Sequence, residues 1–205
     1  MRPRDPRRWR GRSRALPPGP PEGLPRPSPA LRRLPGAPWE ATPAGVVSRQ
    51  RAELAGVERL WPAAELGRLY WADVERLFRG LVRAEERDGR VELVVLRRPL
   101  VLLSFDRVVL EDDPDRTAAT FPIASGLLVA PDGRHAGHLR LSAQTGPGGA
   151  LTLCSEVAGF RPSLAGWGRL AGRLGWLYAQ TQLRIHLLVT WSWMGALADW
   201  RGGAR

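Results

Sequence analysis

Residues 117–160 read TAATFPIASGLLVAPDGRHAGHLRLSAQTGPGGALTLCSEVAGF, and this stretch decides the fold. Two turn signals, Pro131-Asp132-Gly133 and Gly146-Pro147-Gly148-Gly149, divide it into three strand-like segments. Those segments are Thr117–Ala130, Arg134–Gln144 and Leu151–Phe160. Because the turns are short, neighbouring strands can pair antiparallel, whereas a parallel crossover needs a much longer connection. The stretch therefore predicts an antiparallel meander.

Alternation along the last two segments assigns the two faces of this sheet, since successive side chains of a strand point to opposite sides. One side is apolar and carries Leu139, Leu141, Ala143, Leu151, Leu153 and Val157. The other side is polar and carries His138, Arg140, Ser142, Gln144, Thr152, Cys154 and Glu156. Such a pattern is typical of a sheet that is covered on one face only.

Working outward, the runs Val91–Leu96 and Leu100–Leu110 add two strands, and residues 46–58 form either a short helix or an irregular strand. Apolar spacing over residues 62–87 predicts an amphipathic helix, and the same spacing over about 165–199 predicts a long C-terminal helix. The fold class is therefore α+β: a meander of five to six strands packed on the C-terminal helix and preceded by the amphipathic helix.

Charge and proline content separate a tail from a domain. The 31 basic residues are all arginine and exceed the 20 acidic ones, for a net charge of +11. Residues 1–40 hold ten arginines and three acids, a net +7, and residues 1–43 hold twelve of the 19 prolines. Proline removes a backbone donor, so we expect residues 1–43 to be a disordered basic tail, or to precede the true start, and 44–205 to be one domain.

Composition also limits the compartment and the chemistry. Arginine without lysine suggests GC-rich coding of a bacterial type, which lowers the weight of any single arginine. No apolar run follows the basic start, which argues against a secretory signal. The uncharged stretch Ile185–Ala198 has 14 residues, too few for a membrane span. We expect a cytoplasmic protein, with peripheral membrane contact through Trp191-Ser192-Trp193 left open.

Candidate metal and catalytic groups have simpler interpretations. His135 and His138 are separated by an odd strand spacing that sends them to opposite faces, and no third ligand is near. The acidic group Glu111, Asp112, Asp113 and Asp115 is interpreted as a solvated hairpin tip. Cys154 with His186 as its base is disfavoured because Cys154 lies on the polar side of its strand. We therefore assign no catalytic residue, no metal site and no cofactor.

His186 is the strongest candidate for a ligand-binding polar residue because it lies in the most apolar part of the C-terminal helix. A buried imidazole needs a partner or a ligand. It is either a satisfied core histidine or a polar anchor in an otherwise hydrophobic cavity. Gln180, Thr181, Gln182 and Arg184 lie one or two turns earlier and could add polar groups.

The order of the elements, with local cues in Thr120–Val129, Gly137–Ala143 and Ser155–Pro162, resembles the helix-grip fold of the START-like superfamily, which includes polyketide-cyclase-like (SRPBCC-type) proteins. The resemblance covers about residues 62–199, and a first strand would have to come from 46–58. It implies an apolar cavity between sheet and C-terminal helix for a lipid-like or polyketide-like molecule. The expected ligand-binding residues are His186, Gln182, Tyr178, Ser125, Leu141 and Leu153.

Three functional hypotheses follow. The first is a non-enzymatic carrier of a hydrophobic small molecule, in which apolar burial supplies affinity. The second is a cyclase-like or hydratase-like enzyme that uses the same cavity with His186 as acid or base. The third is weak, sequence-independent contact with nucleic acid through the basic region Arg2–Arg14.

Overall fold

The computed structural model describes residues 39–42, 45–54, 60–87, 90–95, 100–146, 149–161, 163 and 186–198. Within these ranges nine strands form one antiparallel sheet in the order β1-β2-β9-β8-β7-β5-β4-β3, and β6 pairs with β7 off this path. The strands are β1 (Trp39–Thr42), β2 (Gly45–Leu54), β3 (Val82–Arg87), β4 (Arg90–Val95), β5 (Leu100–Phe105), β6 (Val109–Asp112), β7 (Arg116–Ser125), β8 (Gly137–Thr145) and β9 (Leu151–Phe160).

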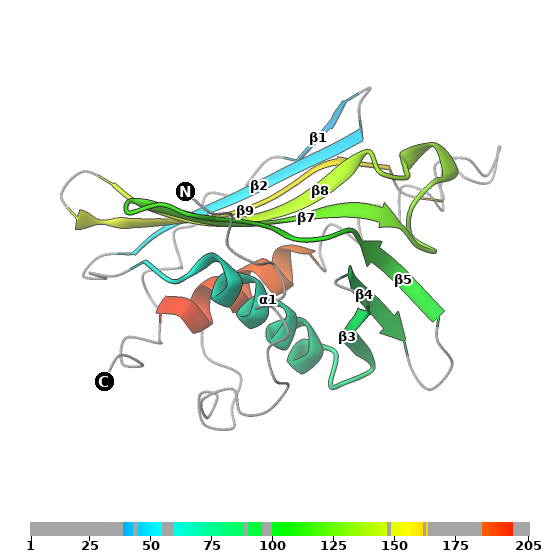
Figure 1. The fold of residues 1–205 in the computed structure, drawn as a ribbon, viewed down its shortest axis with the longest axis horizontal. Helices are drawn as coiled ribbons and strands as arrows, with labels where there is room; N and C mark the ends of the chain where they lie inside the picture. The colour runs from blue at the N-terminus through cyan, green and yellow to red at the C-terminus, as the bar shows by residue number, and fades with distance from the viewer. Residues whose placement is uncertain are drawn as a thin grey trace, which may run out of the picture.

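Two helical elements cover one face of the sheet (Figure 1). They are α1 (Ala63–Leu77) and the described part of the C-terminal helix, residues 186–198. Both lie under the long strands β7, β8 and β9 in Figure 1, while β3, β4 and β5 turn away from those strands at one end. The predicted α+β architecture, a meander packed on helices, is confirmed.

Strict alternation on β8 and β9 places the core as the sequence predicts. Leu141 and Leu153 are fully buried, whereas His138, Arg140 and Cys154 on the opposite side are partly exposed. We call the helix-covered side the inner face and the opposite side the outer face. Aromatic rings fill the middle of the inner face through edge-to-face and tilted contacts, which link Tyr70, Trp71, Phe105, Phe121 and Trp193.

A glycine sets the bend where β2 meets β9. The register moves from Ser48 opposite Val157 to Val46 opposite Phe160, so β9 carries one extra residue, a β-bulge. Gly159 has a φ of 68°, and a Cβ at this position would lie 2.4 Å from the carbonyl oxygen of Ala136. Only glycine meets both conditions without strain.

The predicted helix over residues 62–87 is wrong in its last ten residues. The helix ends at Leu77, and Val82–Arg87 forms strand β3 instead. Arg79 and Gly80 have positive φ values of 50° and 73°, and the Gly80 N–H donates to the Glu75 carbonyl at 2.8 Å. With the Arg79 N–H donating to the Arg76 carbonyl, this closure is of the Schellman type, and the left-handed residue that ends the helix is Arg79, followed by Gly80.

Other boundaries also differ from the prediction. The run Leu100–Leu110 divides into β5 and β6, and of the two alternatives for residues 46–58 the strand is correct, with β2 pairing to β9 through a register shift. With β1 and β3 added, the sheet has nine strands instead of five to six. Strand β1 lies within the segment that was expected to be tail. Residues 1–38, and the part of the expected helix 165–199 before residue 186, lie outside the described residues.

The first turn of α1 depends on a carboxylate from strand β6. Pro62 occupies the N-cap position and makes no side-chain capping bond. The N–H of Ala63, a fully buried residue, donates to Asp112 Oδ1 at 2.8 Å. Asp112 therefore performs the role of a capping side chain from a distant part of the chain, and a negative charge at this end also favours the helix dipole.

Replacing Asp112 with alanine is expected to lower the free energy of unfolding by about 1 kcal/mol, because the Ala63 N–H loses its acceptor. Urea unfolding of both proteins measures this. Asp113→Ala is the matched control, since the neighbouring carboxylate is exposed. Equal midpoints for Asp112→Ala and Asp113→Ala would contradict the capping role.

Candidate functional site

A chain of polar groups, buried except for the partly exposed His186, joins α1, the C-terminal helix and the sheet. The Tyr70 hydroxyl lies 3.4 Å from His186 Nδ1 and also hydrogen-bonds the hydroxyl of Thr190. Thr190 Oγ1 in turn donates to Ser155 Oγ at 3.3 Å. Thr190 and Ser155 have no exposed surface, and Tyr70 is 5% exposed. We call these four residues the polar chain.

Each member is placed by the periodicity of its own element. Tyr70 is on the buried side of α1, and His186 and Thr190 are one helical turn apart on the C-terminal helix. Ser155 follows Leu153 on the inner face of β9, and its partner on β2 is Gln50. Gln50 is buried as well, and its Nε2 donates to Ser48 Oγ at 2.7 Å.

Several buried polar atoms around this chain have no hydrogen-bond partner among the described residues. They include His186 Nε2, Gln50 Oε1, Trp193 Nε1, Trp71 Nε1 and Thr117 Oγ1. Native proteins rarely leave such atoms unpaired, because each costs about 1–3 kcal/mol when it is removed from water without a partner. Within the described residues, these atoms are therefore candidate hydrogen-bonding positions for a bound ligand or ordered water.

The titratable groups of the polar chain are neutral near pH 7. Burial lowers the pKa of His186 to about 4. Burial also raises the pKa of Tyr70, an effect that the hydrogen bond with Thr190 opposes and the charge of Asp73 reinforces. The neutral imidazole of His186 has two tautomers: Nε2 is an acceptor where Nδ1–H donates to Tyr70, and a donor where Tyr70 donates to Nδ1.

An ion pair next to the polar chain joins the two helices. Arg76 contacts Asp73 one turn earlier on α1, and Arg76 Nη2 also donates to Ser192 Oγ of the C-terminal helix at 2.9 Å. Burial raises the pKa of Asp73, while Ser192 and Arg76 act in the opposite direction. Asp73 is 5% exposed, so a carboxylate without Arg76 at this position would be costly.

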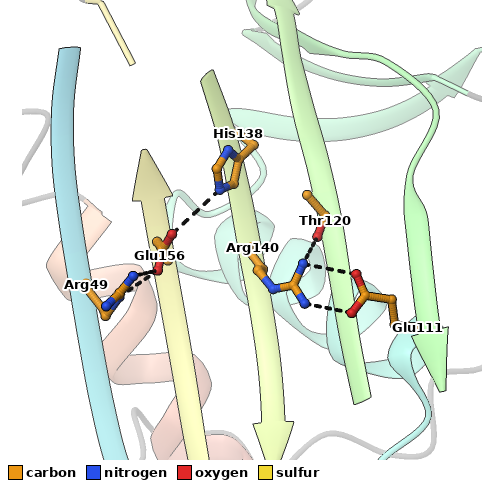
Figure 2. A network of polar contacts seen from close by, with 6 residues as sticks. All are labelled: Arg49, Glu111, Thr120, His138, Arg140 and Glu156. Carbon is orange, nitrogen blue, oxygen red and sulfur yellow. Dashed lines mark hydrogen bonds and ion pairs between the residues drawn. The ribbon is translucent and has the colours of Figure 1, made fainter. Parts of the chain in front are cut away.

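The outer face carries a separate row of charged side chains across four strands (Figure 2). Arg49 pairs with Glu156, which lies 3.7 Å from His138, and Arg140 holds Glu111 through two hydrogen bonds of 3.1 and 2.7 Å. The bond from Arg140 lowers the pKa of Glu111. Opposite charges are paired here, so the row stabilises the sheet through ion pairs between neighbouring strands.

The metal and nucleophile candidates are separated by the fold. His135 contacts Asp106 at 3.0 Å, whereas His138 faces Glu156. The interpretation of Glu111 and Asp112 as a solvated hairpin tip is wrong, because both lie in β6 and bind Arg140 and the α1 terminus. Burial raises the pKa of the Cys154 thiol, which lies on the outer face, away from His186. Within the described ranges no three metal-ligating side chains gather.

The structure brings some of the predicted ligand-binding residues together and separates one. His186 joins the polar chain, and Leu141 and Leu153 line the fully buried inner face beside Ser155. Ser125 lies at the end of β7 opposite Ser104. On β7, the residue level with Ser155 is Ala119, because both lie opposite Leu141 of β8. Ser125 is six residues, or ~20 Å, farther along β7. Tyr178 and Gln182 lie outside the described residues.

The remaining polar residues at this junction were not predicted from the sequence. They are Ser48, Gln50, Tyr70, Ser155, Thr190 and Trp193. A signal was available for two of them, because Ser48 and Gln50 alternate with Arg49 and Arg51 and must share the inner face with Ala52 and Leu54.

The α+β arrangement that the element order predicted, an antiparallel sheet packed on helices along one face, is present in the structure. No family model and no curated protein matches this sequence. Among solved structures, the crystal structure of Ara h 8.0201 is 14% identical, with a TM-score of 0.34 over 74% of this chain and 99% of that chain. CalU16 from Micromonospora echinospora is 14% identical, with a TM-score of 0.28 over 78% of this chain and 93% of its own. Scores this low carry no conclusion about function.

The described helices contain no segment that is long and apolar enough to cross a membrane. Leu188 and Trp191 are exposed on the C-terminal helix, at 65% and 41% of their surface. Peripheral membrane contact through the Trp191 region therefore stays a prediction.

Acidification is expected to destabilise the protein through His186. The unfolded histidine gains a proton below about pH 6.5, whereas the folded one stays neutral down to about pH 4, so stability present above pH 6.5 is lost between these values. From pH 7 to pH 5 this loss is ~2 kcal/mol. His186→Asn is expected to lose ~2 kcal/mol less than the wild type over the same range, measured by urea unfolding at both pH values.

His135→Asn is the matched control, because that histidine is exposed and its positive φ of 57° suits asparagine. This variant is expected to keep the acid sensitivity of the wild type. If the loss of stability between pH 7 and pH 5 disappeared in His135→Asn and persisted in His186→Asn, the acid sensitivity would not come from His186.

Proposed function

We propose that this protein binds a hydrophobic small molecule between the inner face of the sheet and the C-terminal helix, without converting it chemically. The supporting observation is the set of buried, unpartnered polar atoms that surrounds the polar chain in an otherwise apolar interior. Ligand sites in proteins combine these features: mostly apolar walls and a few polar groups that set orientation.

Apolar burial would supply most of the affinity. Removing apolar surface from water contributes about 25 cal/mol per Å², before the costs of association are subtracted. The polar groups would then select among hydrophobic molecules, because a ligand that leaves Gln50 or Trp193 unpaired loses the bonds that another ligand would make.

The enzyme hypothesis receives no support from the environment of His186. With a pKa of about 4 the imidazole is neutral near pH 7, so the imidazolium form that would act as a general acid is scarce and the neutral ring is a weak base. The nucleic-acid hypothesis depends on Arg2–Arg14, which lie outside the described residues, and so stays a prediction.

Two measurements on the purified full-length chain test the proposal. Native mass spectrometry is expected to detect a bound small molecule, and a thermal-shift panel of fatty acids, sterols and polycyclic aromatic compounds is expected to contain at least one stabilising class. A ligand at 100 times its Kd adds ~2.7 kcal/mol, which raises Tm by several degrees.

Thr190→Val is expected to weaken the binding of a stabilising compound by about tenfold, because it removes a central hydroxyl of the polar chain and preserves the side-chain shape. Thr152→Val is the matched control on the outer side of β9 and is expected to bind normally. No bound molecule together with no stabilising class would overturn the proposed function.

A further inference from the structure

The proposed function can be extended to the chemistry of the ligand, and this inference rests on that function. We infer that the bound molecule is uncharged and carries both a carbonyl-type oxygen, held by the Trp193 indole, and a hydroxyl group, held by the Gln50 side-chain carbonyl. Each of these two protein atoms is buried and lacks a partner among the described residues.

The two atoms can each play only one role. An indole Nε1–H only donates, so Trp193 needs an acceptor such as a ketone, ester or ether oxygen. Gln50 Nε2 already donates to Ser48, which leaves Oε1 of the same amide as an acceptor that needs a donor. His186 Nε2 also lacks a partner, and its tautomer decides whether it accepts from a ligand hydroxyl or donates to a ligand oxygen.

These groups belong to the same junction of sheet and helices. Gln50 lies opposite Ser155 on neighbouring strands, and Ser155 accepts the hydrogen bond from Thr190. Trp193 is one turn after Thr190 on the same helix, and its ring centroid lies 5.9 Å from that of Tyr70. Trp193 has no exposed surface and Gln50 only 2%, so bulk water does not satisfy either group.

The electrostatics of this junction favour a neutral ligand. The buried polar and charged residues of the described chain are Ser48, Gln50, Asp73, Ser104, Thr117, Ser155 and Thr190, and no arginine is among them. The low pKa of His186 keeps this imidazole uncharged, and the positive charge of Arg76 is already paired with Asp73. Asp73 already pairs with Arg76, and its charge would repel an anion. A carboxylate would therefore be buried without compensation, which is costly.

Binding of five matched probes to the full-length protein at about pH 6 tests this inference, because a phenol is neutral and a carboxylic acid ionised there. The probes are diphenylmethane, 4-benzylphenol, benzophenone, 4-hydroxybenzophenone and 4-benzoylbenzoic acid. They share two rings and differ in acceptor, donor and charge. By titration calorimetry, 4-hydroxybenzophenone is expected to bind about tenfold more tightly than benzophenone, and 4-benzoylbenzoic acid about tenfold more weakly than benzophenone.

Two substitutions separate the two groups. Gln50→Leu is expected to abolish the tenfold gain from the hydroxyl while leaving benzophenone binding unchanged. Trp193→Phe is expected to abolish the advantage of benzophenone over diphenylmethane and to leave the affinity for 4-benzylphenol unchanged. Gln144→Leu on the outer face and Trp191→Phe on the exposed side of the same helix are the matched controls, and both are expected to bind like the wild type.

Three results would overturn the inference alone: 4-benzoylbenzoic acid binding as tightly as 4-hydroxybenzophenone, equal affinity for all five probes, or the same probe ranking in Gln50→Leu and Trp193→Phe as in the controls. The last of these would mean that ordered water satisfies both atoms. No binding by any probe, with the protein folded by circular dichroism, would count against the proposed function as well. Should Trp193→Phe fail to fold, Gln50→Leu alone decides the hydroxyl contact.

Discussion

A wide antiparallel sheet with one apolar face has to cover that face, and the rest of this structure depends on this constraint. Leu139, Leu141, Leu151 and Leu153 project to one side of β8 and β9, where they are buried. Two helices supply the cover, and each must then be held against the sheet. For α1 the attachment at its start is Asp112, a carboxylate from β6, which satisfies a buried N–H that Pro62 cannot.

Covering an apolar face does not require polar groups, which makes the polar chain informative. If His186 Nε2, Gln50 Oε1 and Trp193 Nε1 had no partner of any kind, their combined cost would be ~3–9 kcal/mol. Domains of this size are stable by only ~5–15 kcal/mol in total. Apolar residues of similar volume would avoid this cost, so packing alone does not explain these three residues. The bound molecule proposed above would supply their missing partners.

Much of the fold follows from local sequence signals, whereas the site depends on pairing between distant segments. Leu151–Phe160 was predicted with its observed bounds because alternation and a flanking Gly-Pro-Gly-Gly turn agree. The end of α1 was missed because Leu81 continues the helical spacing, whereas the positive φ values of Arg79 and Gly80 end the helix there. Gln50 was missed for a different reason: its role depends on lying opposite Ser155, 105 positions later in the chain, and no local pattern contains that register.

The same alternation explains why the strong positive charge of the sequence says little about what the domain binds. Arg49 and Arg51 on β2 and Arg140 on β8 all lie on the outer face, between inner residues such as Ser48, Gln50 and Leu141. Arg49 and Arg140 are paired there with Glu156 and Glu111. Because successive side chains of a strand point to opposite faces, the charged residues lie outside and their neighbours in the sequence lie inside. Under the proposed function, a molecule beneath the sheet would meet hydroxyls, an amide, indoles and a neutral imidazole. Shape and hydrogen bonding, rather than the net charge of the chain, would then determine which molecule binds.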